Sequence, residues 1–404
     1  RKGVMESFLE EFGLSNAEGL ALMCLAEALL RVPDEDTADK LIAEKIVTGK
    51  WAEHLGKSDH WLVNAGTFGL MLTGRVVKLP DEMKGEASAV LGNLIKQMGE
   101  PVVRAGAMQA MRILGEQFVL GRNIDAALKR GASMVRQGLA TRYSFDMLGE
   151  GARTDADAER YLEAYAKAID AVGKAAEGKG PHASNGVSVK LSALHPRYEA
   201  RQEARVVKEL YPRMLRLAEA AKKWNIGLAI DAEEADRLVL SLRLFEKLAL
   251  EPALKDWEGL GIVIQAYQKR TRALIARLAQ LARVRGTPIQ TRLVKGAYWD
   301  GEVKRAQVMG REDFPVWTTK AATDVHYLAC ARDLLAVRAI FPQFATHNAH
   351  TVAAVRRLAA SAGREDFEFQ RLHGMGEALY AALETPLPVR VYAPVGGHED
   401  LLPY

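Results

Sequence analysis

From residue 143 onward, short apolar runs that can form buried strands alternate with stretches of helical periodicity. This alternation constrains the fold most, because it is typical of parallel strands joined by crossover helices. The apolar runs cover residues 143–149, 187–194, 227–234, 261–268, 289–297, 343–349, 367–374 and 389–396. Helical stretches between them include residues 155–173, 203–224, 236–248 and 271–284.

Eight such units over about 260 residues predict an α/β fold, a (β/α)8 TIM-like barrel. An open doubly wound sheet is the competitor, and it is less favoured because no Gly-x-Gly-x-x-Gly follows the first run. After the eighth run only residues 398–404 remain. We therefore expect the last barrel helix to be absent from this chain.

Residues 1–118 have helical patterns and no strand-like alternation, which predicts an all-helical arm or bundle before a barrel over residues 119–404. Ser15 and Glu18 form a capping-box pattern ahead of an apolar run at residues 20–30. Because the chain starts with Arg1 rather than Met, we expect it to be a fragment.

Composition excludes several classes of protein. The net charge of +4 is small for 404 residues and no long basic block occurs, so we expect no nucleic-acid binding by this segment. Cys24 and Cys330 are the only cysteines, which disfavours a disulfide framework or zinc ribbon and favours a reducing compartment. No apolar run reaches the length of a membrane-spanning helix.

Polar residues cluster where the predicted strands end, and a TIM barrel carries its active site at that end. A purely structural barrel needs no charges facing inward, since burying them unpaired is costly. These residues are Asp146 and Glu150; Lys190, Ser192 and His195; Asp231, Glu233 and Glu234; Gln265, Tyr267 and Gln268; Arg292, Lys295 and Tyr298; Thr346, His347, Asn348 and His350; Gln370, Leu372 and His373; Tyr392 and Pro394.

The fifth run is especially informative, because Arg292 interrupts it and Lys295 and Gly296 follow. Two cations beside a flexible glycine suit an anionic cofactor better than a hydrophobic interior.

Several of these residues also have structural interpretations. Lys190 could face solvent, Asp231 could cap the next helix, and Arg292 could be an ion-pair partner of Asp231 or Asp146. Glu233, Glu234 and Asp236 suit the first turn of a helix, and Tyr298, Trp299 and Tyr392 could be packing residues. His347 and His350 resemble a metal pair, but their spacing at a strand end puts them on opposite faces, so we predict no metal site.

Long motifs in a consistent order resemble the proline dehydrogenase domain of proline utilization A. They are VKLSALHPRY at residues 189–198, IDAEE at 230–234, IQAYQKR at 264–270, RLVKGAYWD at 292–300, FATHNAH at 344–350, LHGMGE at 372–377 and YAPVG at 392–396. The similarity covers nearly the whole chain, including GEQF at residues 115–118.

The resemblance implies a barrel that holds FAD, oxidises L-proline to 1-pyrroline-5-carboxylate by hydride transfer to flavin N5, and passes the electrons to a membrane quinone. It implies a cytoplasmic protein with peripheral contact at the inner membrane face, and an aldehyde dehydrogenase half in the full-length polypeptide. The implied cofactor residues are Gln265, Arg292, Val294, Lys295, Gly296, Trp299, Thr318, Lys320, Thr323, His347, Asn348 and Gln370. The implied catalytic and proline-pocket residues are Arg292, Lys190, Asp231, Tyr298, Leu372 and Tyr392.

The chain also departs from the family pattern. In the family an arginine pair and a glutamate on the helix after the eighth strand bind the proline carboxylate, and this chain ends at Tyr404, before they are expected. The DNA-binding N-terminal module that some members have is also expected to be absent.

Within this interpretation, Arg292 tunes the flavin ring, Lys295 binds the pyrophosphate, Lys190 pairs with the substrate carboxylate, and Tyr392 closes over the proline ring. Two alternatives stay open at this stage. One is a Schiff-base aldolase that uses Lys190 or Lys295, and the other is a non-catalytic flavin-binding fragment.

Overall fold

The computed structural model describes residues 119–138, 140–383 and 387–397. The predicted capping box at Ser15, the other N-terminal helical patterns, and residues 398–404 lie outside the described residues, as does the position expected for a last barrel helix.

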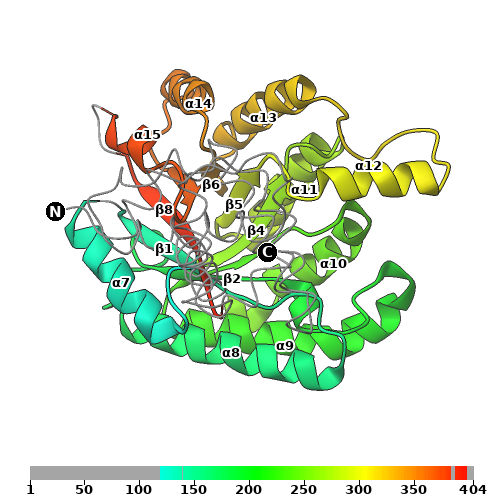
Figure 1. Cartoon of the computed structure of the whole chain (residues 1–404), viewed down its shortest axis with the longest axis horizontal. Coiled ribbons are helices and arrows are strands. Elements are labelled where there is room, and N and C mark those ends of the chain that lie inside the picture. Colours follow the sequence, from blue (N-terminus) through cyan, green and yellow to red (C-terminus); the bar gives the residue numbers. More distant parts are fainter. Residues whose placement is uncertain (1–118, 139, 384–386, 398–404) are drawn as a thin grey trace, which may run out of the picture. The chain divides into compact units, whose positions relative to one another are not determined.

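The described chain forms a closed barrel in which each strand pairs in parallel with its sequence neighbours and β8 pairs with β1 (Figure 1). This confirms the predicted (β/α)8 architecture. The strands are β1 Arg142–Met147, β2 Gly186–Val189, β3 Gly227–Ile230, β4 Leu260–Gln265, β5 Ile289–Val294, β6 Ile340–Ala345, β7 Glu368–Leu372 and β8 Val389–Val395.

Helices surround the barrel, one after most strands (Figure 1). They are α7 Ile124–Arg136, α8 Asp155–Lys174, α9 Glu203–Lys223, α10 Leu238–Ala249, α11 Thr271–Arg285, α12 Trp299–Val308, α13 Lys320–Leu335, α14 Ala349–Ser361 and α15 Glu377–Ala381. Short 3-10 turns lie at Leu191–Ala193, Ala200–Gln202, Ala235–Arg237 and Pro252–Leu254. Among the helices of the described ranges, none has the length and apolar character to cross a membrane.

The predicted apolar runs match the strands in number and order, but several extend too far at the carboxyl end. The run at 187–194 contains β2, which ends at Val189, and a 3-10 turn follows. In β2 and β3 the ladder ends immediately before a charged residue, Lys190 and Asp231 respectively, and both side chains line the barrel mouth. The sixth run was placed late, since β6 already begins at Ile340 and includes Pro342.

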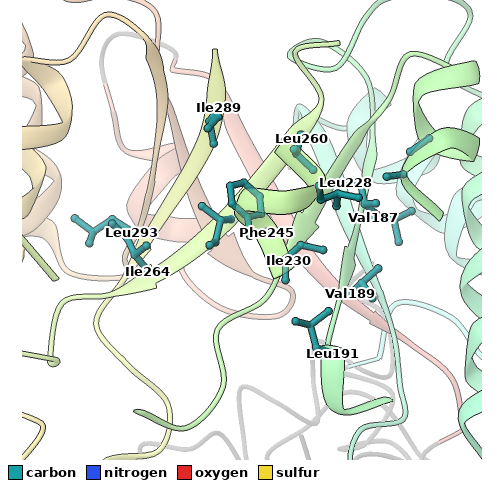
Figure 2. Close-up of a cluster of buried hydrophobic side chains, with 14 of the residues drawn as sticks. Val187, Val189, Leu191, Leu228, Ile230, Phe245, Leu260, Ile264, Ile289 and Leu293 are labelled. Carbon is teal, nitrogen blue, oxygen red and sulfur yellow. The ribbon is translucent and has the colours of Figure 1, made fainter. Parts of the chain in front are cut away.

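The strands alternate strictly between two environments. Val187 and Val189 of β2, like Leu228 and Ile230 of β3, are buried apolar residues on the side that faces the helices (Figure 2). Ile264 of β4 belongs to the same buried cluster. These outward residues supply the hydrophobic contacts that hold the helices on the barrel.

Many of the inward positions are polar, in place of the branched apolar residues that usually fill such a barrel. Glu368 of β7 is fully buried and its Oε1 accepts hydrogen bonds from Arg390 Nε at 2.7 Å, Gln343 Nε2 at 2.8 Å and Gln370 Nε2 at 2.8 Å. Burial opposes ionisation of Glu368, yet Arg390 outweighs it and lowers the pKa of the carboxyl. A charged pair therefore forms part of the barrel interior.

We expect Arg390→Met to destabilise the fold by about 3–5 kcal/mol, because it leaves the Glu368 carboxylate buried without its main partner. The measurement is urea unfolding at neutral pH. Arg216→Met is the matched control, since Arg216 pairs with Glu163 on the surface, where such pairs contribute about 0–1 kcal/mol. Equal effects of the two substitutions would contradict a structural role for the buried pair.

Candidate active site

A cavity of about 710 Å³ opens at the carboxyl ends of the strands. Residues of β4 to β8 and of loops that follow the strands line it, beginning with Glu150 after β1. The lining residues are Glu150, Lys190, Asp231, Ala232, Val263, Gln265, Arg292, Val294, Lys295, Gly296, Ala297, Tyr298, Lys320, Ala345, Thr346, His347, Asn348, Gln370, Arg371, Leu372 and Tyr392. Most of the residues predicted as site residues thus share one cavity.

Arg292 projects from β5 into the barrel and is 4% exposed. Its Nη1 donates to Asp231 Oδ1 at 2.8 Å, and its Nη2 donates to the hydroxyls of Ser188 at 2.9 Å and Ser144 at 3.3 Å. The guanidinium also lies 5.1 Å from the centre of the Tyr392 ring. The ion pair considered as a structural interpretation therefore exists, and it fixes Arg292 in the cavity wall.

Lys190 and Tyr392 complete a network of charges beside Arg292. Lys190 Nζ donates to Asp146 Oδ2 at 2.6 Å and to the Tyr392 hydroxyl at 3.2 Å, and lies 3.6 Å from Asp231 Oδ2. The Tyr392 hydroxyl is 2.7 Å from Asp146 Oδ2 and 2.7 Å from Asp231 Oδ2. Lys190 therefore does not face solvent, and Asp231 contacts Arg292 and Tyr392 in place of capping a helix.

Burial shifts the titration of two carboxyl groups at this network. It raises the pKa of Asp146, an effect that Lys190 opposes and Asp231 reinforces. It raises the pKa of Glu150 to about 7, again against the influence of Lys190, whose Nζ lies 3.9 Å away.

A second wall presents hydrogen-bonding groups from β4, β6 and β7. Gln370 is 1% exposed, and because its Nε2 donates to Glu368, its Oε1 is left buried without a partner. Gln265 Nε2 donates to the Glu233 carbonyl at 2.9 Å. His347 Nε2 accepts from the Leu372 amide at 2.9 Å, which requires a neutral ring; burial, with Arg371 adding, lowers the pKa of His347.

The loop after β5 brings cations to the cavity rim. Gly296 has φ +141, and a Cβ there would lie 2.5 Å from the Tyr267 ring, so only glycine fits without displacement. Lys295 and Lys320 both pair with Asp324 of α13, and Lys320 is the first residue of that helix. The rim thus combines two ammonium groups with the N-terminus of a helix, an arrangement that favours anions.

Three residues predicted for the cofactor site do not line this cavity. Trp299 is 41% exposed and donates to the Trp317 carbonyl, Thr318 is exposed, and Thr323 is buried within α13. The cause is the path of the chain after β5, where α12 and the following loop carry these side chains away from the strand ends.

Asp146 and Glu150 were singled out at the end of the first run, but neither was assigned to the cofactor site or the proline pocket. The structure brings both to Lys190. Arg371 also lines the cavity, and no sequence pattern pointed to it. His350 is exposed, and the residues described contain no cluster of three metal-ligating side chains that includes His347.

Comparisons with known proteins show which family this chain resembles. Residues 127–404 match the family model described as "Proline dehydrogenase". The "Bifunctional protein PutA" of Salmonella typhimurium is 52% identical over 413 residues, covering 100% of this chain and 31% of the relative. "Proline dehydrogenase" of Deinococcus radiodurans is 29% identical over 299 residues, covering 73% of this chain and 86% of the relative.

Solved structures agree with these matches. A crystal structure of a Bradyrhizobium japonicum proline utilization A mutant has a TM-score of 0.71 and 51% identity, covering 100% of this chain and 40% of that one. A Bdellovibrio bacteriovorus PutA structure, described as inactivated by N-propargylglycine, has a TM-score of 0.69 and 27% identity, covering 92% and 41%. The chain thus spans about a third of the length of the PutA relatives.

One prediction was wrong. Residues 4–118 match the family model described as "DNA-binding domain of Proline dehydrogenase", against the expectation of no nucleic-acid-binding module in this segment. The small net charge misled because it is a sum over the whole chain and says nothing about one region. With the barrel, the cavity and the match over residues 127–404 together, the chain belongs to the proline dehydrogenase family.

Proposed function

We propose that this protein binds FAD and oxidises L-proline to 1-pyrroline-5-carboxylate, the first step of proline catabolism. The observation that carries the proposal is the cavity in which Arg292, Lys190 and Asp231 meet Gln370, inside a barrel of the proline dehydrogenase family. The inactivation of a relative by N-propargylglycine supports an N-alkyl amino acid as the substrate class.

The cavity residues fit FAD. An isoalloxazine ring carries one N–H donor and two carbonyl acceptors, and the buried Oε1 of Gln370 is an acceptor without a partner. The diphosphate needs cations, and Lys295 and Lys320 lie on the rim near the N-terminus of α13. Gly296 keeps the wall between these two regions free of a side chain.

When bound, FAD supplies a hydride acceptor, so that proline loses a hydride from its Cδ and a proton from its nitrogen as the C=N bond forms. The chain's own task is to hold the substrate in one orientation and to exclude water. Lys190 provides a cation for the substrate carboxylate, and Leu372 and Tyr298 provide apolar cavity walls. Tyr392, held by Asp146 and Asp231, limits the space beside the ring.

Arg292 would stabilise the negative charge that develops on the flavin ring. Its guanidinium is fixed by Asp231 and two serines before any ligand binds, so it stabilises developing negative charge without reorganising. The Schiff-base alternative is less compatible with the contacts. Such a lysine needs an amine that is free to attack a carbonyl carbon, whereas Lys190 and Lys295 form ion pairs with Asp146 and Asp324.

The proposal extends to the longer polypeptide. We infer that the electrons pass to a membrane quinone, and that an aldehyde dehydrogenase half consumes the product, as the name "Bifunctional protein PutA" of the relatives suggests. In this proposal residues 1–118 form a separate region ahead of the barrel at residues 119–404.

The direct test is anaerobic addition of L-proline to the FAD-loaded protein while the visible flavin absorption is recorded. Bleaching is the expected result, and N-propargylglycine should prevent it. A protein that binds FAD but is not bleached by proline would be only a flavin-binding fragment.

Arg292→Met should slow flavin reduction by proline about 10²–10³-fold, the range observed when one preorganised donor to a developing charge is lost. Stopped-flow absorbance gives the rate. Arg277→Met serves as a control, because Arg277 pairs with Glu246 on the surface. Unchanged reduction kinetics would remove Arg292 from the mechanism.

Lys295→Met should weaken FAD binding about 10–100-fold and leave riboflavin binding nearly unchanged, since a charge-assisted contact to phosphate contributes about 1.5–3 kcal/mol. Fluorescence titration measures both ligands. Lys269→Met, which removes a lysine paired with Asp313 away from the cavity, should affect neither. Equal weakening of FAD and riboflavin would contradict a phosphate-binding role.

A further inference from the structure

The carboxyl group of Glu368 in β7 is surrounded by hydrogen-bond donors. Arg390 forms an ion pair with both of its oxygens, since Nε lies 2.7 Å from Oε1 and Nη2 lies 3.2 Å from Oε2. Gln343 Nε2 and Gln370 Nε2 each lie 2.8 Å from Oε1. Because a carboxylate held in such an ion pair can only accept hydrogen bonds, each glutamine must present its amide nitrogen to Glu368.

The orientation of the Gln370 amide therefore follows from the hydrogen bonds around it, although its two ends have nearly the same shape. Reversing the amide would bring its oxygen against the carboxylate, where two acceptors repel. With the nitrogen held by Glu368, the amide oxygen is left over. That oxygen is buried, and among the residues that the structure describes none donates a hydrogen bond to it. Gln370 lines the cavity and Glu368 does not, so we assign the oxygen to the cavity side.

Gln265, the other glutamine of the cavity wall, shows the contrast. Its Nε2 donates to the Glu233 carbonyl at 2.9 Å, and its Oε1 accepts from the Ala297 amide at 3.4 Å. Both ends of this side chain are thus used within the chain. Since a buried acceptor without a donor is costly, a ligand gains more by donating to Gln370 than to Gln265.

We propose that Glu368 is a positioning residue that sets ligand specificity, because it keeps the Gln370 oxygen turned toward the cavity. At this point the wall offers an acceptor and no donor, so it selects a ligand group with an N–H bond over one with lone pairs alone. The inference rests on the proposed function for its ligand, in which that group is the N3–H of the isoalloxazine ring. Glu368 and Arg390 act on cofactor recognition from deeper in the barrel, without touching the cofactor.

The probe is 3-deaza-FAD, in which a C–H group replaces the N3–H with little change in shape. Fluorescence titration compares its affinity with that of FAD. The unaltered protein should bind FAD about 10–100-fold more tightly, because the analogue leaves the Gln370 oxygen buried without a donor. Gln370→Met removes that oxygen, so the affinity ratio should fall to about threefold or less.

The role of Glu368 is tested by removing its ion pair as a whole. The Glu368→Met/Arg390→Met variant leaves neither partner as an unpaired buried charge, so the fold should be retained. Gln370 can then turn its nitrogen toward the flavin carbonyls beside position 3, and the affinity ratio should fall about fivefold or more. Glu163→Met/Arg216→Met is the matched control, since it removes an ion pair on the surface and should leave the ratio unchanged. An undiminished ratio in Glu368→Met/Arg390→Met or in Gln370→Met would overturn the inference.

Nuclear magnetic resonance gives a second readout that needs neither flavin nor the double variant. In ligand-free protein with nitrogen-15 glutamine, the side-chain amide signal of Gln370 is the one that Gln370→Met removes. Its protons should exchange slowly with solvent, because the nitrogen faces the buried Glu368 carboxylate. Rapid exchange would mean that the amide nitrogen faces the cavity, and the inference would then be wrong.

These outcomes separate the inference from the proposed function. A protein that binds no flavin contradicts the proposed function, and the exchange of the Gln370 amide protons still decides the orientation. A protein that prefers FAD as expected, but whose flavin is not bleached by proline, keeps the inference and loses the proposed activity.

Discussion

Closure of the sheet is the constraint from which the other features of this protein follow. β8 pairs with β1 over six residues, so no strand edge remains and every second side chain of each strand must lie inside the barrel. In this chain many of those side chains are polar or charged. Since water cannot solvate them there, each charge must find a partner from another strand.

The strand register supplies these partners in layers. Glu368 of β7 and Arg390 of β8 meet in the interior, and Arg292 of β5 meets Asp231 at the end of β3 nearer the mouth. The layers are linked, because Glu368 binds the amide nitrogen of Gln370 and thereby leaves the amide oxygen for the cavity. Contacts deeper in the barrel thus orient groups at its mouth.

This layering explains how far sequence reasoning could go. The alternation of apolar runs and helices is a local pattern, so it predicted the barrel and the number and order of its strands. Polar residues at strand ends predicted that Lys190, Asp231, Arg292 and Tyr392 share one site. The ends of β2 and β3 were placed too late. Lys190 and Asp231, which follow them directly, form ion pairs with residues from other strands, and the pattern of a single strand contains no such information.

The errors in assigning site residues also arose because local patterns do not encode contacts between distant segments. Asp146 was treated as one strand-end residue among many, because its importance depends on contacts with β2 and β8 that no local pattern encodes. Trp299, Thr318 and Thr323 lie on α12, the loop after it and α13, and their positions depend on the path of an irregular segment. Residues fixed to strands were therefore easier to assign than residues carried by connections.

The same network sets a condition on any ligand. Lys190 and Arg292 are already paired within the chain, so a carboxylate gains only the difference between its own contacts and those it replaces. The same contacts hold the two cations in place before a ligand arrives, so they need not reorganise when it binds. The network that reduces the gain from each new contact therefore also fixes the geometry of the site.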